Sequence, residues 1–232
     1  MEPPIRGSSL PAAAVPRAVV AVTFDPFSLC EPLQIWLRQL TGLCLPVVWT
    51  PYGDVMASLR SPESAWSSNE GINVLIARAC DLGRVTTSAD PAAELVAAVH
   101  RSCALRRGGV TIVILPPHSA DAQPAMPGSG GDGLLAQALS ECPGVVVVDE
   151  AAVGAAFADL GGRERVLSDF MGRVAHAPYT AAAASALGLL ATRQLARALA
   201  PRRKVVCLDC DNTLWGGAVG ELGALDCPLI AY

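Results

Sequence analysis

Short apolar runs rich in valine and isoleucine alternate with longer helical patterns through most of this chain. The five runs expected to be strands are 18–24, 44–49, 72–78, 110–115 and 145–148. Strands that are apolar at nearly every position are typical of a parallel sheet covered on both faces. Because crossovers between parallel strands are right-handed, we expect an α/β fold: a three-layer, doubly wound parallel sheet, flavodoxin-like, with strand order 2-1-3-4-5.

The stretches between these runs carry helix signals. The expected helices are 31–40, 54–59, 91–106, 134–141, 149–160 and 180–199. The first is expected to carry Pro32 in its first turn and to bury Leu33, Leu37 and Leu40 on one face. Segment 168–179 has no sustained helical period and is expected to be a loop.

Proline marks the expected domain boundaries. Several prolines interrupt residues 1–17, which we expect to be a flexible leader, and Pro201 separates the last expected helix from a further strand. We therefore expect a first α/β domain over 18–200 and the start of a second domain over 201–232.

Composition excludes several classes of protein. Only 16% of the residues are charged and the net charge is −4, so we expect no nucleic-acid partner. The eight cysteines have no disulfide-framework spacing, which favours reduced thiols. There is neither a signal-peptide pattern nor an apolar run of the roughly 20 residues that span a bilayer, so we expect a cytoplasmic protein without a membrane partner.

A pair of carboxylates follows the run 205–208, which is apolar and β-branched like the other expected strands. Asp209 and Asp211 come directly after it at spacing two, so in extended backbone both carboxylates face the same side. Paired carboxylates at the carboxyl end of a strand suit a hard cation such as Mg²⁺. The residues that follow can hold a turn and let the backbone approach a phosphate group: Asn212, Thr213, Gly216 and Gly217.

The stretch D-C-D-N-T-L-W-G-G at 209–217 resembles motif I of the haloacid dehalogenase (HAD) superfamily of phosphotransferases. Its context, 204–221, and H-A-P-Y-T at 176–180 resemble the FkbH-like family of polyketide biosynthesis, HAD-superfamily phosphatases of subfamily IIIC with an SGNH-like N-terminal domain. The resemblance implies that 18–200 is SGNH-like and that 201–232 holds the first strand of an incomplete HAD-like Rossmannoid domain. It also implies an enzyme that dephosphorylates 1,3-bisphosphoglycerate, a glyceryl phosphate donor, and loads the glyceryl group onto an acyl carrier protein.

Roles for the motif residues follow from the resemblance together with the carboxylate chemistry. Asp209 and Asp211 are expected to bind Mg²⁺, with Asp209 attacking or orienting the phosphoryl group and Asp211 exchanging a proton. Cys210 between them is a candidate to carry the glyceryl thioester. A core thiol is the alternative that the sequence leaves open.

A second site is expected at the topological switch point of the first domain. There the loops 25–28 and 78–81 should meet, and His176 can reach them from the last loop. The SGNH-like resemblance implies a triad of Ser28, Asp169 and His176. However, Ser28 has no G-D-S around it, and Asp169 lies seven residues before His176 rather than three. The alternative is that His176 only fixes its loop by hydrogen bonding.

The chain departs from the FkbH-like pattern after motif I. Residues 217–221 still fit the pattern, but 222–232 do not, and later Ser/Thr, Lys and Asp residues of the phosphatase are absent. We therefore expect a chain truncated after motif I that is inactive by itself, and whether it is an enzyme stays open. The alternative to glyceryl transfer is a catalytically inactive remnant or a carrier-protein interaction module. The sequence predicts no oligomeric state.

Overall fold

The computed structural model describes residues 17–42, 45–106, 108–117 and 131–200. Five strands form one wholly parallel sheet in the order β2-β1-β3-β4-β5, which confirms the predicted doubly wound order. The strands are β1 (Ala18–Val22), β2 (Val47–Trp49), β3 (Ile72–Ile76), β4 (Thr111–Ile114) and β5 (Val145–Val148). The part of the chain up to Leu199 forms one compact unit.

The three central strands, β1, β3 and β4, are buried at every position, as their almost wholly apolar sequences predict. Register places Val20 beside Trp49 on one side and Val74 on the other. The edge strand β5 is only partly buried. Because all five strands are parallel, their carboxyl ends lie along one edge of the sheet.

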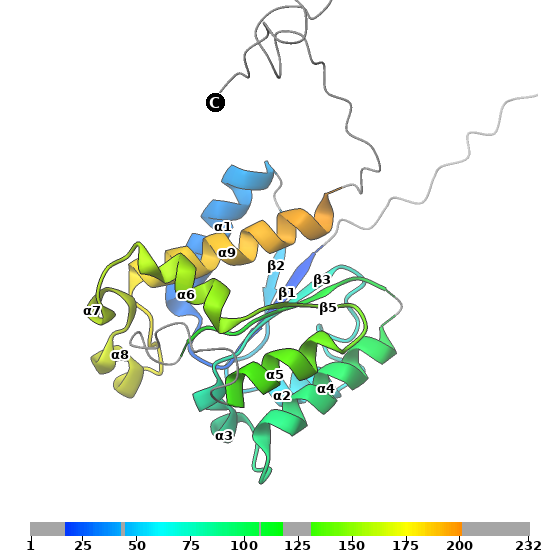
Figure 1. Cartoon of the computed structure of the whole chain (residues 1–232). Helices are drawn as coiled ribbons and strands as arrows, with labels where there is room; N and C mark the ends of the chain where they lie inside the picture. Colours follow the sequence, from blue (N-terminus) through cyan, green and yellow to red (C-terminus); the bar gives the residue numbers. More distant parts are fainter. Residues whose placement is uncertain (1–16, 43–44, 107, 118–130, 201–232) are drawn as a thin grey trace, which may run out of the picture. The chain divides into compact units, whose positions relative to one another are not determined.

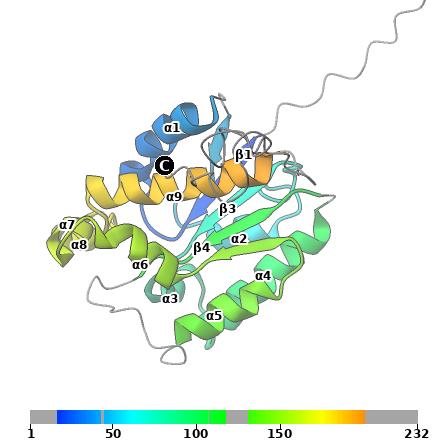
Figure 2. The same ribbon diagram turned by 45° about the horizontal axis from the view of Figure 1, so that its top comes forward.

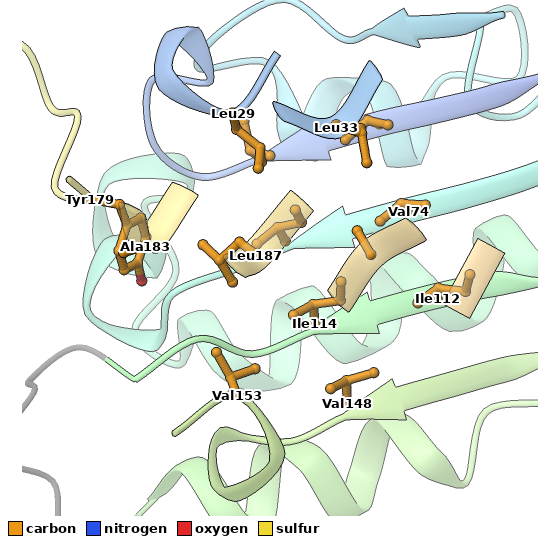
Figure 3. Close-up of a cluster of buried hydrophobic side chains, with 14 of the residues drawn as sticks. Leu29, Leu33, Val74, Ile112, Ile114, Val148, Val153, Tyr179, Ala183 and Leu187 are labelled. Carbon is orange, nitrogen blue, oxygen red and sulfur yellow. The ribbon is translucent and has the colours of Figure 1, made fainter. Parts of the chain in front are cut away.

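Helices cover both faces of this sheet (Figures 1 and 2). On one face lie α1 (Phe27–Thr41), α6 (Glu150–Ala158) and α9 (Ala181–Leu199), and on the other lie α2 (Val55–Arg60), α4 (Pro91–Leu105) and α5 (Gly131–Ser140). Each face has its own apolar core. Figure 3 shows the first core, in which Leu33 of α1 and Leu187 of α9 lie with Val74 and Ile114 of the sheet.

Helix α1 differs from its prediction. It begins at Phe27, one turn earlier than expected, so Pro32 lies inside the helix rather than in its first turn. Its buried stripe is Leu29, Leu33 and Leu37, while Leu40 is 48% exposed. The misplacement arose because Pro32 was interpreted as a start signal, whereas Pro26 occupies the N-cap.

Segment 168–179 is not the continuous loop that was expected. It contains α8 (Asp169–Val174), whose N-cap Ser168 accepts a hydrogen bond from the backbone N–H of Met171 at 3.3 Å. Further short helical segments that the sequence analysis did not predict are η1 (Ala79–Asp81), α3 (Leu82–Val85) and α7 (Arg163–Val166). Segments of three to six residues carry too few positions for a periodic pattern to emerge.

Among the described residues, no helix is long and apolar enough to cross a membrane.

Candidate functional site at the sheet switch point

The loops after β1 and β3 lie at the centre of the carboxyl edge of the sheet. The chain leaves β1 toward α1 on one face and leaves β3 toward α3 and α4 on the other, so the two connections diverge there. The backbone N–H of Arg78 donates to the Thr23 hydroxyl at 3.0 Å. The backbone N–H of Asp25 donates to the carbonyl of His176 at 2.9 Å. The late loop therefore reaches the switch point, as the topology predicted.

Asp81 supplies the buried carboxylate of this site, with its side chain 5% exposed. Its Oδ2 accepts a hydrogen bond from the Thr23 hydroxyl at 3.3 Å and lies 3.6 Å from Nε of Arg78. Its Oδ1 lies 3.1 Å from Nε2 of His176. A buried carboxylate is costly unless it is paired and hydrogen-bonded, and these three partners meet that need from three separate segments.

His176 links the buried carboxylate to a tyrosine. An ionised carboxylate only accepts hydrogen bonds, so Nε2 of His176 carries the hydrogen that faces Asp81. In the tautomer that carries its hydrogen on Nε2, Nδ1 is an acceptor for the hydroxyl hydrogen of Tyr52. The Tyr52 and His176 rings meet edge to face, with centroids 5.8 Å apart. The contacts thus form a line from Tyr52 through His176 to Asp81.

The backbone of His176 is unusual. Its φ of 54° lies in the left-handed region, which residues other than glycine rarely occupy. Such conformations persist where the surrounding contacts over-determine them. Here the carbonyl of His176 is held by Asp25 and its ring by Asp81 and Tyr52.

Local electrostatics keep the hydroxyl and the nearby thiol protonated. Partial burial, together with the negative charge of Asp25, raises the pKa of Tyr52. Burial also raises the pKa of Cys80, although Nη2 of Arg78 lies 3.1 Å from its sulfur. Neither side chain is therefore a ready anion at neutral pH.

Arg78 supplies the positive charge beside Asp81. Its guanidinium carbon lies 5.8 Å from the centre of the Tyr179 ring, and its Nε makes no hydrogen bond with the described residues. Tyr179 lies beneath it and is almost completely buried. The cation is thereby held between an aromatic ring and the carboxylate.

The residues of the predicted triad have different partners in the structure. Ser28 is half-buried in the first turn of α1. Asp169 lies on the exposed helix α8, where its carboxylate accepts two hydrogen bonds from Arg163, at 2.6 and 2.9 Å, and these lower its pKa. Within the described residues no hydrogen bond joins Ser28 or Asp169 to His176, whose carboxylate partner is Asp81. The triad of Ser28, Asp169 and His176 stays a prediction without geometric support.

Three residues of this site were not predicted from the sequence: Thr23, Tyr52 and Asp81. Asp81 lies within the segment 78–81 that was expected at the switch point, and Tyr52 follows β2, the neighbour of β1. Their position in the sequence could have indicated them, because all are polar side chains placed just after adjacent parallel strands.

The motif I residues lie outside the described residues. These are Asp209, Cys210, Asp211, Asn212, Thr213, Gly216 and Gly217. In the described part of the chain, no group of three or more His, Cys, Asp and Glu side chains is placed to hold a metal ion. A hollow of about 230 Å³ lies between α3 and the start of α4, but its lining includes none of Tyr52, Asp81 and His176.

Comparison with known proteins bears on the fold. No family model matches the chain, and no curated protein does. The structure is similar to the crystal structure of the N-terminal part of the protein BF1531 from Bacteroides fragilis, which contains a phosphatase domain and is complexed with Mg. The TM-score is 0.61 at 16% sequence identity, over 94% of this chain and 62% of that one. This likeness establishes an α/β fold, and the chain spans less than two thirds of the length of that structure.

Proposed function

We propose that this chain belongs to an FkbH-like enzyme that dephosphorylates 1,3-bisphosphoglycerate and loads the glyceryl group onto an acyl carrier protein. The observation that carries the proposal is D-C-D-N-T-L-W-G-G at 209–217, directly after an apolar run and after a doubly wound domain. Similarity to a structure that contains a phosphatase domain supports the reaction class, phosphate removal.

The donor set of motif I fits Mg²⁺. Asp209 and Asp211 offer hard oxygen ligands two residues apart, and Mg²⁺ is commonly bound through one or two carboxylates while keeping several waters. When bound, the ion would neutralise charge on the phosphoryl oxygens. The similar phosphatase-domain structure was obtained with Mg, which is consistent with this assignment.

The side chains of motif I have separate tasks in the proposal. Asp209 attacks or orients the phosphoryl group, and Asp211 exchanges a proton with the oxygen of the departing or entering group. Gly216 and Gly217 let the backbone approach the phosphate closely. Cys210 is the proposed carrier of the glyceryl group as a thioester.

The test combines the purified chain with Mg²⁺, 1,3-bisphosphoglycerate and an acyl carrier protein. Phosphate release and the mass of the carrier protein are both followed. We expect the chain alone to release no phosphate, and release to appear once the chain is extended with the later Ser/Thr, Lys and Asp residues of the family pattern. EDTA should abolish that release, and Asp209→Asn in the extended protein should lower it at least about a hundredfold, since general acid–base or nucleophilic groups contribute at least that much. Release that persists in Asp209→Asn and Asp211→Asn would contradict the motif assignment.

The alternative, a carrier-protein interaction module, predicts a different result in the same experiment. The chain would bind the carrier protein without phosphate release and without acylating it. Peptide mass spectrometry locates the acyl group: an adduct that persists in Cys210→Ala excludes that cysteine as the carrier. If the chain and its extended form neither bound the carrier protein nor released phosphate, both functions would be contradicted.

A further inference from the structure

The switch point lines up a hydroxyl, an imidazole and a carboxylate without using any residue of motif I. The Tyr52 hydroxyl contacts Nδ1 of His176, and Nε2 of the same ring faces Oδ1 of Asp81 at 3.1 Å. This is the connectivity by which a carboxylate orients an imidazole and the imidazole removes a proton from a hydroxyl. The three side chains come from three separate connections at the same edge of the sheet.

Exposure falls along this line in the order that such a site requires. Tyr52 is 51% exposed, whereas the side chains of His176 and Asp81 are 14% and 5% exposed. A substrate from solvent can therefore reach the hydroxyl, while the imidazole and carboxylate behind it are shielded from water. Shielding strengthens the interaction between the carboxylate and a positively charged ring.

Neighbouring residues fix both Asp81 and His176 in place. Asp81 is fixed by the Thr23 hydroxyl and by Arg78, and the left-handed backbone of His176 is fixed through its carbonyl by Asp25. If His176 served only to tie down its loop, the contact with Asp81 and the carbonyl bond would suffice. A half-exposed tyrosine at the remaining ring nitrogen is not needed for that role.

We propose that the Tyr52 hydroxyl is a nucleophile toward activated acyl esters, with His176 as its base and Asp81 as the residue that positions the imidazole. The site is independent of the phosphate chemistry proposed for motif I. Its substrate class is an ester or thioester with a good leaving group, because acyl transfer to a phenolic oxygen goes forward only when the departing anion is at least as stable as the phenolate.

The proposed reaction has two balanced steps. The Tyr52 oxygen bonds to the acyl carbon while its proton passes to Nδ1 of His176, and the leaving group departs with that proton. In the second step water gives a proton to His176 and its oxygen bonds to the acyl carbon. The bond from the acyl carbon to Tyr52 then breaks, and the tyrosine oxygen recovers the proton from His176.

The test uses p-nitrophenyl acetate with the full chain. p-Nitrophenolate release is measured by absorbance, and the acetyl group is located by peptide mass spectrometry after an acid quench. We expect acetylation at Tyr52 and a release rate above buffer. Tyr52→Phe keeps the aromatic ring and removes only the hydroxyl, and it should abolish both the adduct and the excess rate.

Asp81→Asn tests the positioning role. We expect kcat to fall at least about tenfold with KM unchanged, because Asp81 is buried behind His176 and does not touch the ester. Far-UV circular dichroism checks that this variant is folded. His100→Ala is the matched control, since His100 is exposed on α4 and should leave the rate unchanged.

Three outcomes would overturn the proposal. The first is a Tyr52→Phe variant as active as the parent chain. The second is an acetyl group found on Ser28 in place of Tyr52, which would return the nucleophile to the residue that the family resemblance implies. The third is no excess rate and no adduct in the parent chain.

Discussion

Tyr179 connects the late loop to the first apolar core. Its ring packs edge to face on Phe24, with centroids 5.1 Å apart, and lies 5.9 Å from Phe157. Its hydroxyl donates to the carbonyl of Pro117 at 3.4 Å. Burial raises the pKa of Tyr179 far above its ordinary value. The folded protein therefore holds this proton in alkali, where an unfolded chain would release it.

This raised pKa predicts a loss of stability in alkali. A group whose pKa is higher in the folded state contributes stability fully below the unfolded pKa, about 10 for tyrosine, and loses it as pH rises above that value. In Tyr179→Phe the free energy of unfolding should fall less steeply above pH 10. At neutral pH the same variant should lose about 1 kcal/mol with its hydrogen bond.

Urea unfolding at several pH values measures the slope, and absorbance at 295 nm follows phenolate formation. Tyr52→Phe serves as the comparison, because that side chain is half-exposed and should change the slope less. Phenolate formation at Tyr179 in the folded protein at the pH of an ordinary tyrosine would contradict the argument.

At the scale of elements, α1 and α9 cross with almost no space between their backbones. A Cβ on Gly188 of α9 would come within 3.1 Å of the backbone nitrogen of Leu33 and 3.2 Å of the carbonyl carbon of Pro32. Pro32 inside α1 lacks an N–H, so this close approach leaves no donor of that residue buried. Trp36 of α1 adds a hydrogen bond from its Nε1 to the Ser185 hydroxyl at 3.1 Å.

Replacing this glycine tests the contact between the helices. Gly188→Leu should lower the free energy of unfolding by about 2 kcal/mol or more, because the side chain must push two backbones apart. Gly154 in α6 is the matched control, since a Cβ there meets nothing within 4 Å. Gly154→Ala should stabilise the protein by about 0.5–1 kcal/mol through helix propensity. Chemical denaturation measures the free energy of unfolding of both variants. Equal changes in Gly188→Leu and Gly154→Ala would contradict the close approach of the two helices.

At the scale of the molecule, one sheet separates two apolar cores. Leu187 of α9 belongs to the first core and Leu95 of α4 to the second, and neither side chain is exposed by more than 1%. Both cores share the backbone of the same central strands, so neither can be lost without exposing a face of the sheet. The described domain should therefore unfold as one cooperative unit.

Leu187→Ala and Leu95→Ala should each cost about 2–5 kcal/mol. In each variant, the midpoints from far-UV and near-UV circular dichroism should coincide. Leu134→Ala is the control, because Leu134 is 71% exposed on α5 and its replacement should change stability by less than about 0.5 kcal/mol. Separate transitions for the two faces would show that the cores fold independently.

Local patterns were enough to predict the five strands and their order. The apolar β-branched runs predicted all five strands, since strands packed between two layers of helices are mostly apolar. Handedness of the crossovers then favoured the strand order that is observed. Helix ends were less certain, as the early start of α1 at Phe27 illustrates, because each cap depends on a few residues and on the packing around them.

The sequence by itself determined the doubly wound sheet and the edge at which its loops meet, and it left open whether His176 reaches that edge. Only the tertiary structure decided which side chains His176 would meet. Asp81 lies 95 residues before it and Tyr52 lies 124 residues before it. No local period connects positions so far apart, and partner choice depends on angles at loop ends such as the 54° φ of His176. Periodicity reports which face of an element is buried, whereas a site is made where several elements end.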